Sequence, residues 1–143
     1  MNTLTGCWWL FALPLHFLCL TSPYGYRVHP VTGKYAFHSG IDLRAHHDTV
    51  FAVLPGRVSG VAYDKCLGLN IHLDHGDFQT TYGHLLQVFV FVGDSLTAGS
   101  PMGITGSTGR VTGEHLHFSV RYNGVNIDPL HFLGTIANNL KSK

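Results

Sequence analysis

Residues 113–118 read Gly-Glu-His-Leu-His-Phe, and the chain continues through Ser-Val-Arg-Tyr to the pair Asn123-Gly124. Apolar and β-favouring residues that end at an Asn-Gly pair predict a strand followed by a hairpin turn. Side chains on a strand alternate between two faces, so His115 and His117 share one face and Leu116 and Phe118 the other. Two neighbouring imidazoles can bind a metal ion or transfer a proton, although a strand with a histidine-bearing polar face is the simpler alternative. The choice depends on whether the rest of the sequence supplies partners for this pair.

The composition predicts one all-β domain. The chain has 143 residues, which is enough for one domain with a sizeable core and too few for a second of ordinary size. Turn-forming residues recur between short runs rich in Val, Ile, Leu, Tyr and Phe, and helical periodicity is confined to a short piece near the C-terminus. The net charge of +1 lacks the basic excess that nucleic-acid binding requires, so no nucleic-acid partner is expected.

Histidine is the outlier in the composition, with 11 copies against 8 acidic residues. Glu114 is the only glutamate, and the three cysteines do not have the spacing of a zinc site. Metal binding or acid–base chemistry is therefore expected to rest on histidine and aspartate.

An apolar run occupies residues 6–20 at the start of the chain. It suits the length of a signal-peptide core, but no Lys or Arg precedes it and no Ala-x-Ala site follows. We therefore expect residues 1–21 to be an apolar leader and possible signal peptide, with a misplaced start or a non-functional leader as alternatives. Residues 22–133 are expected to form the domain, and residues 134–143 a polar C-terminal tail.

His38 and Asp42 are the first candidate partners of the histidine pair. They lie four residues apart with Gly40 between them, which places them on one face of a strand or lets them converge across a bulge. An imidazole and a carboxylate are good zinc ligands, and one more imidazole would complete three protein ligands with an open position for water. His84 ends another strand-like run. The zinc-hydrolase motif His-Glu-x-x-His is absent, so proton transfer would fall to histidine.

Several of these motifs occur together in a known family. The chain resembles the lysostaphin-type (LytM-like) M23 zinc metallopeptidases, which cut peptide bonds in bacterial peptidoglycan, over about residues 22 to 133. The matching motifs are Ser-Pro-Tyr-Gly-Tyr-Arg at 22–27, His-Ser-Gly-Ile-Asp at 38–42, Tyr-Gly-His-Leu at 82–85, Gly-Ser-Thr-Gly at 106–109 and His-Leu-His-Phe at 115–118. The resemblance implies a compact antiparallel β-sheet domain with an open active-site groove and little helix.

The resemblance also implies roles for five residues. His38, Asp42 and His117 correspond to the ligands of one zinc ion per chain, and His84 and His115 to the catalytic pair. The implied substrate is the peptide part of peptidoglycan, and the implied location is secreted, periplasmic or in the cell envelope. The chain departs from the family at Ala45-His46-His47-Asp48, where the family commonly has Ala-Pro-x-Gly. These extra histidines are interpreted as surface residues, with adventitious metal binding as the alternative.

Two functions from different classes follow. The first is an active peptidoglycan endopeptidase that works as a monomer and does not insert stably in a membrane once the leader is removed. The second is a non-catalytic module that binds wall peptides or activates a partner hydrolase through the same groove. A lipoyl-type or biotinyl-type carrier domain is disfavoured, because Met102 has no neighbouring Lys to modify.

Overall fold

The computed structural model describes residues 11–141 of the chain. Its elements are β1 (Leu20–Ser22), β2 (Gly25–Val28), β3 (Tyr35–His38), β4 (Ile41–Arg44), β5 (Thr49–Phe51), β6 (Gly56–Asp64), β7 (Gly68–Asp74), β8 (Phe78–Val88), β9 (Ser95–Leu96), β10 (Pro101–Thr105), β11 (His115–Tyr122), β12 (Val125–Ile127) and α1 (Pro129–Lys141).

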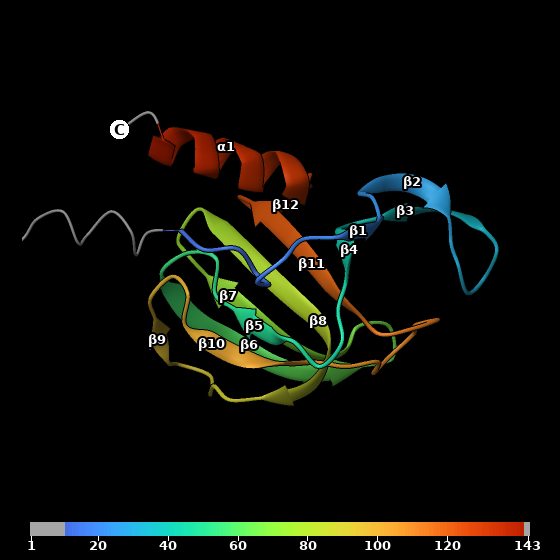
Figure 1. Ribbon diagram of the computed structural model, residues 1–143, viewed down its shortest axis with the longest axis horizontal. Helices are drawn as coiled ribbons and strands as arrows, with labels where there is room; N and C mark the ends of the chain where they lie inside the picture. Colours follow the sequence, from blue (N-terminus) through green and yellow to red (C-terminus); the bar gives the residue numbers. More distant parts are fainter. Residues whose placement is uncertain (1–10, 142–143) are drawn as a thin grey trace, which may run out of the picture.

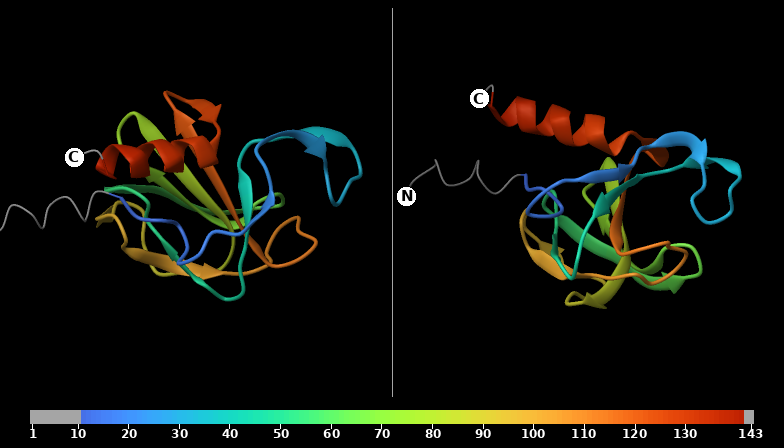
Figure 2. Two further views of the ribbon diagram at one scale, coloured as in Figure 1. Left: turned by 45° about the horizontal axis from the view of Figure 1, so that its top comes forward. Right: turned by 45° about the vertical axis from the view of Figure 1, so that its right-hand side comes forward.

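Antiparallel strands dominate the architecture. Within residues 11–141, ten strands form one sheet in which the path β1-β4-β11-β8-β7-β6-β9 is extended by β5, β10 and β12. The strands β2 and β3 form a separate hairpin that projects from the body of the sheet (Figures 1 and 2). Every strand pairing in this part of the chain is antiparallel. The expected all-β fold with little helix is confirmed.

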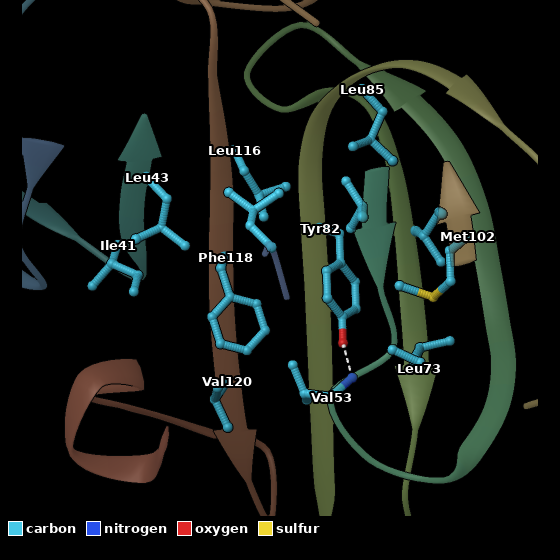
Figure 3. Packing of buried hydrophobic residues seen from close by; sticks show 14 of the residues in the cluster. Ile41, Leu43, Val53, Leu73, Tyr82, Leu85, Met102, Leu116, Phe118 and Val120 are labelled. Atoms are coloured by element: carbon cyan, nitrogen blue, oxygen red, sulfur yellow. Dashed lines mark hydrogen bonds between the residues drawn. The ribbon is translucent and has the colours of Figure 1, made fainter. Parts of the chain in front are cut away.

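The core lies against the face of β11 that carries Leu116, Phe118 and Val120, all of which are buried (Figure 3). The strand β11 lies between β4 and β8, so buried side chains of all three strands meet there. Tyr82 of β8 packs beside Phe118, and its hydroxyl oxygen accepts a hydrogen bond of 3.2 Å from the backbone N–H of Val53. Burying each such large apolar side chain contributes about 1.5–3 kcal/mol, which holds the opposite, histidine-bearing face of β11 in a fixed register.

Several residues of the expected leader pack against the sheet. The side chain of Leu15 is 2% exposed and belongs to the hydrophobic core. Backbone hydrogen bonds of 2.8–2.9 Å join Pro14 to Phe51 and Cys19 to Arg44, and β1 pairs with β4. The expected boundary at residue 22 therefore falls inside β1. Residues 1–10 of the expected leader lie outside the described residues, and its role as a possible signal peptide stays a prediction.

The expected polar tail is helical as far as Lys141. Asp128 accepts a hydrogen bond of 3.0 Å from the backbone N–H of Leu130, and Pro129 occupies the first helical position, so α1 has a well-formed N-terminus. The side chains of Phe132 and Leu133 are buried in the core, which anchors the helix beside the sheet (Figure 1). No helix among the described residues has both the length and the apolar character needed to cross a membrane.

Candidate metal centre and active site

Strand register brings the two His-bearing motifs together. In the β4–β11 pair Asp42 lies directly opposite His117, and on the other side of β11 His117 lies opposite Gly83 of β8. The chain reaches His38 from Asp42 through a tight bend at Ser39 and Gly40. A Cβ atom at residue 40 would lie 2.5 Å from the Phe118 carbonyl oxygen and 2.9 Å from the His117 ring. Glycine at residue 40 therefore permits the close approach that joins the motifs.

Three donor atoms of this cluster form a nearly equilateral triangle. His38 Nε2 and His117 Nδ1 each lie 3.3 Å from Asp42 Oδ1, and the two nitrogens are 3.4 Å apart. All three side chains are buried. Zinc bonds of roughly 2.0–2.1 Å in tetrahedral geometry require ligand atoms about 3.4 Å apart. The three residues thus have the chemistry and the spacing to hold a zinc ion.

The backbone orients His38 for metal binding. Its Nδ1 atom lies 2.9 Å from the carbonyl oxygen of Pro23, which can only accept a hydrogen bond. The proton of the neutral ring is therefore on Nδ1, and the Nε2 lone pair points at Asp42 and His117. Donation from the other ring nitrogen to a carbonyl is the arrangement found in metal-ligating histidines.

Electrostatics keep Asp42 ionised. Burial acts to raise its pKa, but hydrogen bonds from His117 and His38 in their protonated forms, and the charges of protonated His38 and His115, outweigh burial and hold the pKa well below its usual range. Arg27 adds a cation, with a terminal nitrogen 3.9 Å from Asp42 Oδ2. The carboxylate is thus available as an anionic ligand.

His84 and His115 form a second pair next to the triangle. Their ring centroids are 4.6 Å apart. The Nδ1 atoms lie 2.7 Å from the Thr108 carbonyl oxygen for His84 and 3.0 Å from the Gly113 carbonyl oxygen for His115. In each ring Nδ1 therefore donates to a carbonyl oxygen and Nε2 remains available. The Nε2 atom of His115 lies 3.5 Å from Asp42 Oδ1.

The environment favours the neutral form of His84. Burial lowers its pKa to about 4; the hydrogen bond to Thr108 opposes this shift, and the nearby His115 and His117 reinforce it. The backbone of His84 has a left-handed φ of 63°, and its N–H donates to the carbonyl oxygen of Leu67 at 2.6 Å. The His84 imidazole is therefore uncharged near neutral pH, and the lone pair on its Nε2 is free.

The cluster opens to solvent in a groove. A hollow of about 190 Å³ contains the five histidine and aspartate side chains, and its other walls include Arg27, Phe37 and Arg110. A neighbouring hollow of about 450 Å³ shares Ser39, Cys66, Leu67 and His117 with the first. The two hollows meet at His117, one of the three residues of the triangle.

All five residues singled out in the sequence meet at this groove, but sequence reasoning missed several neighbours. Arg27 belongs to the motif at residues 22–27, but no sequence pattern predicts its ion pair with Asp42. The sequence also does not predict that the carbonyl groups of Pro23, Thr108 and Gly113 orient the imidazoles, because every residue has a backbone carbonyl.

Comparisons with known proteins identify the family of the chain. Residues 36–129 match the model of peptidase family M23, and the chain belongs to that family. One relative is the peptidoglycan DD-endopeptidase ShyC of Vibrio cholerae, 35% identical over 119 residues that cover 81% of this chain and 28% of the relative. The chain thus spans less than a third of this relative's length.

Solved structures share the fold. A zinc-containing peptidase from Vibrio cholerae superposes with a TM-score of 0.77 at 30% identity, covering 83% of this chain and 39% of that chain. The catalytic domain of the antimicrobial peptidase lysostaphin from Staphylococcus simulans gives a TM-score of 0.73 at 29% identity. The match covers 82% of this chain and 92% of the lysostaphin domain.

Proposed function

We propose that this protein is a zinc metalloendopeptidase that hydrolyses peptide bonds of bacterial peptidoglycan. The observation that carries the proposal is the 3.3–3.4 Å triangle of His38, Asp42 and His117 beside two further imidazoles in an M23 fold. The name of the related peptidoglycan DD-endopeptidase favours cross-link bonds between D-amino acids as the substrate. All five groups come from one chain, which suits a monomer. The related peptidoglycan DD-endopeptidase favours action in the cell envelope or outside the cell.

His38, Asp42 and His117 would hold the zinc ion. A zinc ion with three such ligands would act as a Lewis acid. It would also lower the pKa of bound water, so that a hydroxide nucleophile is available near neutral pH. The contacts with His117 and His38 that lower the pKa of Asp42 outweigh its burial, so the ligand set carries one negative charge.

His84 and His115 would handle the protons. One imidazole takes the proton of the attacking water, and one returns a proton to the leaving amine through Nε2. Because Nδ1 of each ring is bonded to a carbonyl, both rings can act only through Nε2, which suits them to this exchange. In the protonated form they also stabilise the negative charge that develops on the scissile carbonyl oxygen.

The test is digestion of purified sacculi that differ in cross-link chemistry, with mass analysis of the released peptides. The zinc-loaded protein is expected to release peptides from sacculi with direct D-amino-acid cross-links, and a chelator is expected to abolish release until zinc is restored. Absence of any muropeptide change with zinc bound would contradict the enzymatic function and favour the binding-module alternative.

A further inference from the structure

A second cluster of imidazoles and a carboxylate lies where the turn after β4 meets the start of β11. Glu114 Oε1 lies 3.9 Å from His46 Nδ1 and 3.5 Å from His47 Nδ1. One donor atom from each of the three residues lies within 4.8 Å of those from the other two. The cluster shares no residue with the triangle in the groove, and it coincides with the stretch where the sequence departs from its family.

The carboxylate of Glu114 is held in place by its other oxygen. Oε2 accepts hydrogen bonds from the backbone N–H of His47 and, at 3.3 Å, from the Thr105 hydroxyl. The Glu114 side chain is consequently only 17% exposed. Oε1 is left facing both imidazoles.

The turn that carries the two histidines is also fixed. The backbone N–H of His46 donates to Asp48 Oδ2 at 2.9 Å, and that of Asp48 donates to the buried Thr105 hydroxyl oxygen at 2.8 Å. Thr105 thus connects the turn to Glu114, because the same hydroxyl accepts from the turn and donates to the carboxylate. Both sides of the cluster are positioned before any ligand arrives.

The ring nitrogens of the two histidines remain available. Among residues 11–141, the hydrogen bonds of His46 and His47 use their backbone N–H groups, and the distances from ring nitrogen to Glu114 Oε1 exceed hydrogen-bond length. The side chains are 89% and 56% exposed, so small ring rotations can bring the three donors to the roughly 3.4 Å separation of a tetrahedral zinc site. Exposed ion pairs are the simpler alternative, but each contributes only about 0–1 kcal/mol.

We propose that His46, His47 and Glu114 form a second divalent-cation site, more exposed and weaker than the site in the groove. Two imidazoles and one carboxylate suit borderline cations such as Zn²⁺, Ni²⁺ or Cu²⁺, with water completing the coordination. A cation here links the turn after β4 to the residue that precedes His115. Binding therefore stabilises the contact between the turn and the start of β11, independently of catalysis.

Zinc binding to the full chain tests this site, with stoichiometry measured by equilibrium dialysis and metal analysis. Wild type is expected to bind two equivalents in two steps, one tight and one weaker. The double variant His46→Ala/His47→Ala is expected to lose the weaker step alone. Glu114→Gln keeps an oxygen for the hydrogen bonds from Thr105 and His47, and is expected to weaken that step at least about tenfold.

Two further variants separate this inference from the proposed function. His131→Ala removes an exposed histidine outside both clusters and is expected to keep both steps. His117→Ala is expected to lose the tight step and keep the weaker one, so the second site can be measured even without the first. Binding of a single equivalent by wild type up to millimolar zinc, or of two by the double variant with native far-ultraviolet circular dichroism, would overturn the proposal.

Discussion

His115 and His117 lie two residues apart on one face of β11, yet their surroundings differ. Nδ1 of His117 lies in the buried triangle with His38 and Asp42, whereas Nδ1 of His115 donates to the Gly113 carbonyl beside His84. We predict that His117→Ala empties the zinc site in the groove. His115→Ala should keep that zinc and lower kcat by about 10²–10⁴-fold, because it removes a proton-transfer group and no ligand.

Both variants are checked by measuring bound zinc and peptide release on the same preparations. His131→Ala is the matched control, since it removes a histidine that lines neither hollow, and it should resemble wild type. Zinc loss in His115→Ala equal to that in His117→Ala would contradict the division of roles.

At the scale of elements, the segment before β2 is predicted to be part of the cooperative fold. Leu15 is buried among core residues, so Leu15→Ala removes packed methyl groups and should lower the free energy of unfolding by about 2–5 kcal/mol. Urea denaturation of the full chain measures this difference.

Phe17 provides the comparison within the same segment. Its side chain is 86% exposed, and Phe17→Ala should change the free energy of unfolding by no more than about 0.5 kcal/mol. Equal stabilities of the Leu15→Ala and Phe17→Ala variants would show that the segment is not packed as described.

For the whole molecule, buried histidines should make stability sensitive to acid. Burial is the main cause of the lowered pKa of His72, His75 and His84, which for His84 falls to about 4. The unfolded chain has histidine pKa values near 6.5, so below that pH it binds protons that the folded chain does not. The free energy of unfolding of the zinc-free protein should therefore decrease as pH falls from about 6.5 towards 4.

Urea denaturation at several pH values checks the sign of this dependence. His72→Gln should reduce the decrease, because it removes one group whose pKa is lowered by folding, whereas His131→Gln should leave the decrease unchanged. A stability that rises between pH 6.5 and 4 would contradict this account.

The sequence predicts the central strand of the sheet better than it predicts the C-terminal helix. The alternation in residues 113–118 predicted both the buried and the histidine-bearing face of β11, because the period of two is a local property of extended backbone. The turn residues likewise predicted an all-β domain, and the family resemblance implied that its sheet is antiparallel. The extent of α1 was predicted less well: the helical periodicity near the C-terminus is short, and residues 134–143 were expected to form a polar tail, whereas the helix continues to Lys141.

Residue types and motif order were therefore enough to name the five groups of the candidate site, since imidazole and carboxylate chemistry belongs to the side chains themselves. Their convergence needed the tertiary structure. The register of β11 against β4 sets the 3.3 Å distance between His117 and Asp42, which are 75 residues apart in the chain. The carbonyl groups that orient the imidazoles, and the meeting of Glu114 with the turn at His46 and His47, likewise depend on strand pairing, because no local pattern records which distant segments become neighbours.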